Sequence, residues 1–140
     1  KKKKKAYFSA RFKLSDETKS DMFLGLTITD TTAIDGVSDG VFFGKDDGDT
    51  NLDFVVEKDS TETEEAGIHT MEDDTFVTAT FFIDPDRSAV YYSINNAAPV
   101  KVANTNLPDN EELTVTLAIQ AGAAAAKSLT VDYVSAIVER

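Results

Sequence analysis

Apolar residues alternate with polar ones along most of this chain, and this pattern restricts the fold more than any other feature. In Ala6–Leu14 every second residue is apolar, which places Phe8 and Phe12 on one face of an extended strand and Arg11 on the other. The alternation recurs as far as Val138, with almost no 3.6-residue helical period. The sequence therefore predicts an all-β sandwich or barrel.

Turn-forming residues separate nine predicted strands. Asp84-Pro85-Asp86-Arg87 is typical of a type I turn within an antiparallel hairpin, and Asn95-Asn96 is suited to left-handed backbone. A change of phase at Tyr133-Val134 predicts a β-bulge. The acidic stretch Lys58–Asp74 is expected to be an exposed loop. The predicted strands are Ala6–Leu14, Asp21–Thr29, Gly40–Gly44, Asn51–Glu57, Thr75–Asp84, Ala89–Asn95, Val100–Ala103, Glu112–Gln120 and Ser128–Val138.

The length of 140 residues suits one domain with a core of its own. We expect residues 1–5 to form a basic N-terminal tail and residues 6–140 to form a single β-sandwich domain. No apolar run approaches the length of a membrane-spanning helix, so we expect no membrane partner. The absence of cysteine excludes disulfides, thiol catalysis and thiolate metal sites.

The formal net charge is −11, and beyond the five leading lysines the balance is 9 basic against 25 acidic residues, or −16. Such a surface repels a phosphate backbone, so nucleic acid is not an expected partner. The basic run has two interpretations: an unstructured tail, or a flexible tether that docks on an acidic neighbour. This run consists of Lys1, Lys2, Lys3, Lys4 and Lys5.

The spacing E-x-D-x-x-E resembles the catalytic signature of family 16 glucanases, and it is formed here by Glu57, Asp59 and Glu62. That family places apolar residues between the acids, whereas this chain has polar ones such as Lys58, and it contains no tryptophan to stack on a sugar. The stretch is therefore interpreted as a solvated acidic loop, and no catalytic residue is assigned. His69, the single histidine, falls in the same stretch, so a histidine-based zinc site or catalytic triad is not expected.

Four oxygen-bearing side chains surround Gly48: Asp46, Asp47, Asp49 and Asn51. Closely spaced hard oxygen donors on a tight turn are typical of Ca²⁺ loops, but the glutamate that closes an EF-hand is missing. A weak Ca²⁺ site and a plain turn between strands both stay open, and no other cofactor is expected.

Most aromatic residues fall at core positions of the predicted strands, but Tyr7, Phe23, Tyr91 and Phe76 fall on the opposite parity. An outward-facing aromatic row on a β-sandwich suggests contact with a partner, and glycan stacking is the competing use. We therefore take Tyr7, Phe23 and Tyr91, together with the leading lysines, as interface candidates.

Four segments carry a resemblance to a known family: Ala6–Leu14, Phe23-Leu24-Gly25-Leu26-Thr27, Asp39-Gly40-Val41-Phe42-Phe43 and Leu129-Thr130-Val131-Asp132-Tyr133-Val134. Their order resembles that of concanavalin A-like (LamG-like) jelly rolls, and the overall pattern is similar to small virion proteins of tailed bacteriophages. The resemblance implies a two-sheet antiparallel β-sandwich whose first and last strands lie side by side. Proteins with this fold include capsid decoration proteins, head fibres and glycan-binding modules.

The resemblance implies a non-enzymatic structural protein on the capsid surface of a bacteriophage virion. Such a protein would decorate or cement the shell by binding capsid or other virion proteins through a sheet face or edge. A second copy of the chain stays open as a further partner. The alternative is a lectin-like carbohydrate-binding module, and a glycosidase is the third interpretation.

Overall fold

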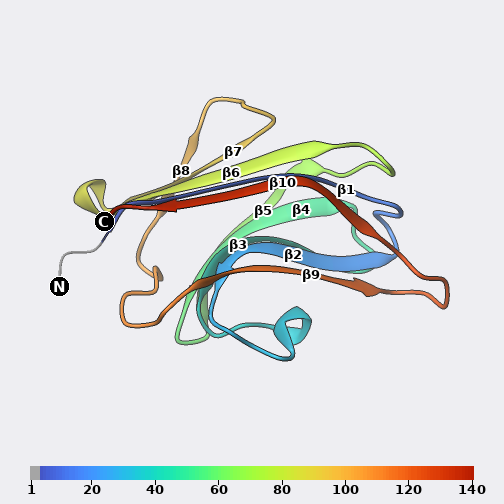
Figure 1. Ribbon diagram of the computed structural model, residues 1–140, viewed down its shortest axis with the longest axis horizontal. Helices are drawn as coiled ribbons and strands as arrows, with labels where there is room; N and C mark the ends of the chain where they lie inside the picture. Colours follow the sequence, from blue (N-terminus) through green and yellow to red (C-terminus); the bar gives the residue numbers. More distant parts are fainter. Residues whose placement is uncertain (1–3) are drawn as a thin grey trace.

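The computed structural model describes residues 4–140, which form two five-stranded antiparallel sheets stacked as a sandwich (Figure 1). Sheet A has the strand order β10-β1-β6-β7-β8, and sheet B has the order β5-β4-β3-β2-β9. The predicted β-sandwich is thus confirmed, and each predicted strand is present with ends that differ by two residues or fewer. The strands are β1 Ala6–Leu14, β2 Ser20–Thr27, β3 Gly40–Lys45, β4 Asn51–Lys58, β5 Thr61–Thr70, β6 Val77–Asp84, β7 Ala89–Ile94, β8 Val100–Ala103, β9 Thr114–Ala121 and β10 Leu129–Val138.

Two short 3-10 helices, η1 (Ala33–Asp35) and η2 (Pro85–Arg87), complete the secondary structure of the described residues. In this part of the chain no helix has the length and apolar character needed to cross a membrane. η2 forms the predicted turn of the β6–β7 hairpin. The turn at Asn95 and Asn96 is also as predicted, because both residues have positive φ angles, 52° and 59°.

The first and last strands lie side by side, as expected: β1 pairs with β10 on one edge and with β6 on the other. The register of β1 with β10 shifts between Arg11, which pairs with Tyr133, and Phe12, which pairs with Val131. The extra residue is Asp132, so the predicted bulge lies next to the position expected. Its carboxylate accepts a hydrogen bond of 2.8 Å from Nη1 of Arg11.

The core between the sheets is centred on phenylalanines. Phe81 on β6 lies 5.0 Å from Phe8 in a stacked arrangement, and its ring is 6.0 Å from Phe43 and 5.8 Å from Phe54 in sheet B. All four side chains are fully buried. Burial of each such ring contributes about 1.5–3 kcal/mol, and the cluster joins the two sheets through apolar contacts.

The stretch Lys58–Asp74 was expected to be an exposed loop, and this prediction is wrong. Residues 61–70 form strand β5, which pairs with β4 as the edge strand of sheet B. The connecting residues Asp59 and Ser60 both have positive φ angles, 50° and 58°, as in a tight two-residue hairpin turn. Aspartate and serine adopt this conformation less readily than the Asn-Gly pair that usually marks such a turn, so the sequence gives little sign of the hairpin. His69 therefore lies on a strand and not in a loop.

Sheet B is curved, and its outer face is concave (Figure 1). The segment that contains η1 connects β2 to β3 and lies on this concave side. Along the strands, outward residues alternate with core residues, so Phe23, Phe42 and Glu57 face outward while Leu24 and Phe43 face the core. The outward side chains of sheet B, on its concave face, are thus positioned to form a binding site.

Candidate ligand-binding cleft

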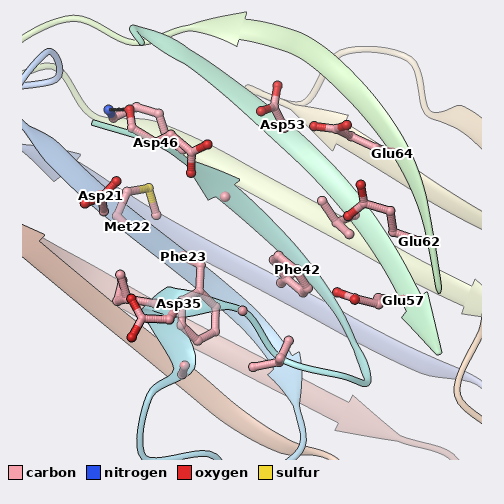
Figure 2. A pocket seen from close by; sticks show the side chains of 17 residues that line it. Asp21, Met22, Phe23, Asp35, Phe42, Asp46, Asp53, Glu57, Glu62 and Glu64 are labelled. Carbon is pink, nitrogen blue, oxygen red and sulfur yellow. Dashed lines mark hydrogen bonds between the residues drawn. The ribbon is translucent and has the colours of Figure 1, made fainter. Parts of the chain in front are cut away.

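The concave face of sheet B holds a cleft of about 490 Å³ (Figure 2). Strands β2, β3, β4 and β5 contribute outward side chains to it, and the η1 segment closes one side. Among the described residues that line the cleft, seven are acidic and one, Lys45, is basic. The acidic residues are Asp21, Asp35, Asp46, Asp53, Glu57, Glu62 and Glu64. The cleft therefore carries a strongly negative potential.

The apolar part of the cleft is formed by Phe23 and Phe42, whose rings meet edge to face at 5.7 Å and 70°. Phe42 is half-buried, and the glycine opposite it on β2, Gly25, leaves room for its side chain. Phe23 was expected to be an exposed interface residue, but only 5% of it is accessible to solvent. It lines the same cleft as the η1 segment, and that segment together with Phe42 accounts for its burial.

Two glutamates face each other across the β4–β5 hairpin, because Glu57 and Glu62 are direct cross-strand partners. Burial raises the pKa of Glu57, and the neighbouring carboxylates of Glu62 and Asp39 raise it further. Two like charges at opposed positions repel each other, so this end of the cleft favours a ligand that neutralises them or donates hydrogen bonds to them.

A second acidic group lies further along the same strands. Burial raises the pKa of Glu64, and the nearby carboxylates of Asp53, Glu62 and Asp46 raise it further. Asp53 is fixed in place, since its Oδ1 accepts a hydrogen bond of 2.6 Å from the backbone N–H of Gly67. The acceptors along β4 and β5 are thus held on rigid strands.

The spacing E-x-D-x-x-E separates in the structure. Glu57 and Glu62 both line the cleft, as Figure 2 shows, whereas Asp59 lies in the turn beyond it and is absent from the lining. The backbone N–H of Asp59 donates a hydrogen bond of 3.2 Å to Oδ1 of the buried Asp39, which fixes the turn. The sequence predicts Glu57 at the end of a strand but places Glu62 in a solvated loop. The T-E-T-E alternation at residues 61–64 is the available signal for a strand there.

The turn between β3 and β4 contains the four Ca²⁺ candidates. Nζ of Lys45, which is 3% exposed, donates hydrogen bonds of 2.8 Å to the backbone carbonyls of Asp46 and Asp49. Burial lowers the pKa of Lys45. Oδ1 of Asp49 accepts from the backbone and side-chain nitrogens of Asn51, while the backbone N–H of Asp47 donates to Asp21. The Lys45 ammonium thus binds two backbone carbonyls of this turn, and these contacts account for the turn conformation.

A different group of acids, Asp16, Glu17 and Asp73, has carboxylate oxygens within 4.8 Å of one another. Lys127 already binds this group, because its Nζ lies 2.6 Å from Oδ2 of Asp16. The hydrogen bond from Lys127 lowers the pKa of Asp16. We therefore interpret this group as an ion-paired corner that holds the β9–β10 connection against the β1–β2 turn.

The other interface candidates lie outside the cleft. Tyr7 and Tyr91 belong to a row of cross-strand partners on the outer face of sheet A, which runs Ile137, Tyr7, Phe82, Tyr91 from β10 to β7. Tyr7 is 37% exposed and Tyr91 is half-buried.

Among the leading lysines, Lys4 is exposed, and Nζ of Lys5 forms an ion pair of 3.1 Å with Asp86. The backbone N–H of Lys5 donates a hydrogen bond to the side-chain carboxylate of Glu139, and the backbone N–H of Glu139 donates one to the carbonyl of Lys5. Lys1, Lys2 and Lys3 lie outside the described residues.

The raised pKa of Glu57 predicts a pH-dependent stability difference for Glu57→Gln. The folded protein binds the proton of the Glu57 carboxyl group more tightly than the unfolded chain does. Ionised Glu57 therefore destabilises the fold. This effect grows as the pH rises above 4.5, the ordinary pKa of a glutamate. We expect Glu57→Gln to have a higher melting temperature than the parent at about pH 7, and the difference to close near about pH 4. Glu112→Gln, at an exposed position before β9, is the matched control in thermal unfolding. Equal melting temperatures of Glu57→Gln and the parent near neutral pH would contradict the prediction.

A comparison of the chain with family models finds no match, and a comparison with curated proteins finds none either.

Proposed function

We propose that this protein is a non-enzymatic carbohydrate-binding module that holds a glycan in the cleft of sheet B. The observation that carries the proposal is the combination of carboxylates on β4 and β5 with the half-buried ring of Phe42 in one cleft of about 490 Å³. Concave sites with a few placed polar groups and an aromatic surface are the usual form of small-molecule sites.

Each part of the cleft has a role in this proposal. Neighbouring sugar hydroxyls donate hydrogen bonds to Glu57, Glu62 and Glu64, and bonds to ionised acceptors are stronger than bonds between neutral groups. The ring of Phe42 packs against the apolar face of a sugar. Because seven carboxylates line the cleft, uronic and sialic acids are repelled, and neutral or amine-bearing sugars are preferred.

A glycan panel measured by isothermal titration calorimetry tests this proposal. The panel contains neutral β-glucan oligosaccharides, glucosamine oligomers and sialylated oligosaccharides, and we expect binding to the first two classes without release of new reducing ends. Binding of glucosamine oligomers should weaken as salt increases. The variant Glu57→Gln/Glu62→Gln should bind at least about tenfold more weakly, or about 1.4 kcal/mol.

Glu112→Gln is again the control, because it changes the same residue type outside the cleft. Phe42→Leu keeps an apolar side chain and tests the stacking contact separately. A flat response across the panel, from a chain shown to be folded by circular dichroism, would end the proposal.

The second candidate is the structural protein of a bacteriophage capsid that the sequence resemblance implies. The row Ile137, Tyr7, Phe82, Tyr91 favours it, because an apolar row across an open sheet face is suited to contact with a protein surface. One measurement distinguishes the two candidates. A capsid protein is found in the particle fraction of a density gradient, at a fixed stoichiometry to the major shell protein. That result, together with a flat glycan panel, would move the function to the second candidate.

A further inference from the structure

One side of the sandwich leaves its core open. β10 is the end strand of sheet A and β9 is the end strand of sheet B, and the two lie on the same side, in the foreground of Figure 1. The packing agrees, since Phe81 of β6 contacts Phe43 of β3 and Tyr92 of β7 contacts Phe54 of β4, which places β10 over β9. We call this side the β9–β10 side.

Core-facing residues of both strands are exposed there. Val115 and Leu117 on β9 pair with the core residues Leu26 and Leu24, yet they are 40% and 37% exposed. Val138 on β10 pairs with the buried Ala6 and is 55% exposed. The residues point toward the space between the sheets, but nothing in the described chain covers them, so the apolar interior continues to the surface.

The four end strands differ in how they are protected against pairing. On the opposite side, β5 carries Glu62, Glu64 and Glu65, and β8 is only four residues long and contains Lys101. Charged side chains and short strands are the usual means by which an edge avoids a further strand. By contrast, β9 has no charged residue over eight positions, and β10 has only Asp132 over ten, with its carboxylate bound to Arg11.

We propose that the β9–β10 side binds a second copy of this chain in an isologous dimer, in which each β10 pairs antiparallel with its copy and sheet A continues across the interface. In this dimer, a twofold axis perpendicular to the sheets relates the two copies. Because β9 lies on the same side of the sandwich as β10, this axis also brings the β9 strands of the two copies together. This inference goes beyond glycan binding and does not depend on it.

Charge restricts where a second copy can bind. The chain carries a net charge of −11, so two copies repel each other over most of their surface. The β9–β10 side is the long, nearly uncharged edge of the described residues, where two copies can approach with few opposing carboxylates. A basic partner would be attracted instead to the seven carboxylates of the cleft, on a different face of the molecule.

Sedimentation equilibrium of the full chain over a series of protein concentrations tests the proposal. We expect a monomer–dimer equilibrium that Val138→Lys, on β10 at a position 55% exposed, weakens at least about tenfold in dissociation constant. Val100→Lys on β8, at a position 43% exposed on the opposite side, is the matched control and should leave the equilibrium unchanged.

Val115→Lys places the charge on β9 instead and serves as the second variant, should Val138→Lys fail to fold by circular dichroism. A parent chain that is monomeric at every concentration would overturn the proposal. A dimer that Val100→Lys weakens, and that Val138→Lys and Val115→Lys leave unchanged, would overturn it as well. Glycan binding is measured separately, so either proposal can fail without the other.

Discussion

Replacement of Phe81 by alanine is expected to lower the free energy of unfolding by about 3–5 kcal/mol. The Phe81 ring contacts Phe8 within sheet A and both Phe43 and Phe54 of sheet B, and all four side chains are fully buried. Alanine would leave a cavity between two sheets that cannot collapse around it, because each is held by its own hydrogen-bonded strands. A loss of this size approaches the whole stability of a typical domain.

Urea unfolding followed by circular dichroism measures this loss, and the neighbouring residue provides the control. Phe82 lies on the same strand but faces outward and is half-buried, so Phe82→Ala removes the same ring without opening the core. We expect Phe82→Ala to cost clearly less than Phe81→Ala. Similar costs for the two variants would contradict the assignment of Phe81 to the inner face.

The second large effect is expected from Gly25→Ala, which adds one methyl group beneath the cleft. A Cβ at this position would overlap the carbonyl oxygen of Val41 and lie 2.6 Å from Cα and 2.7 Å from Cβ of Phe42. Two of these neighbours are backbone atoms of the adjacent strand, so no side-chain rotation relieves the contact. Overpacking of this kind costs about 1–3 kcal/mol or more, and we expect the upper part of that range.

Gly44→Ala is the matched control for Gly25→Ala. Gly44 also lies in sheet B and lines the cleft, but a Cβ there would meet its nearest neighbour, the Phe42 ring, at 3.6 Å, an ordinary contact. Chemical denaturation of both variants should therefore show a large loss for Gly25→Ala and a change within about 1 kcal/mol for Gly44→Ala. Equal losses would mean that the close approach of β2 and β3 is not the cause.

Much of the fold could be predicted from the sequence, because most strands have one polar and one apolar face and this difference is visible at every second residue. The segment Ala6–Leu14 shows this most clearly, since the apolar positions Phe8, Ala10, Phe12 and Leu14 are all buried. The hairpin at Asp84–Arg87 was also predictable, because proline at the second position of a turn restricts the backbone in a known way.

The cleft could not be predicted in the same way. Its acidic wall depends on strand β5, whose outward positions are glutamates and whose inward positions include Thr63 and Glu65 in place of clearly apolar residues. An edge strand with one polar and one mixed face lacks the alternation that identifies the other strands. The burial of Phe23 depends on where the η1 segment lies, and that placement is a tertiary contact without a local signal.

The pairing of β1 with β10 has a consequence for how the chain folds. Ala6 pairs with Val138, 132 positions later, and the other neighbour of β1 is β6, which begins at Val77. β1 therefore has no partner nearby in sequence, and sheet A is complete only when β10 has paired with β1. Long-range pairing of this kind is typical of slow folding, on the millisecond to second scale. Until β6 and β10 have paired with β1, Phe8 and Phe12 lack the neighbours that bury them in the folded protein.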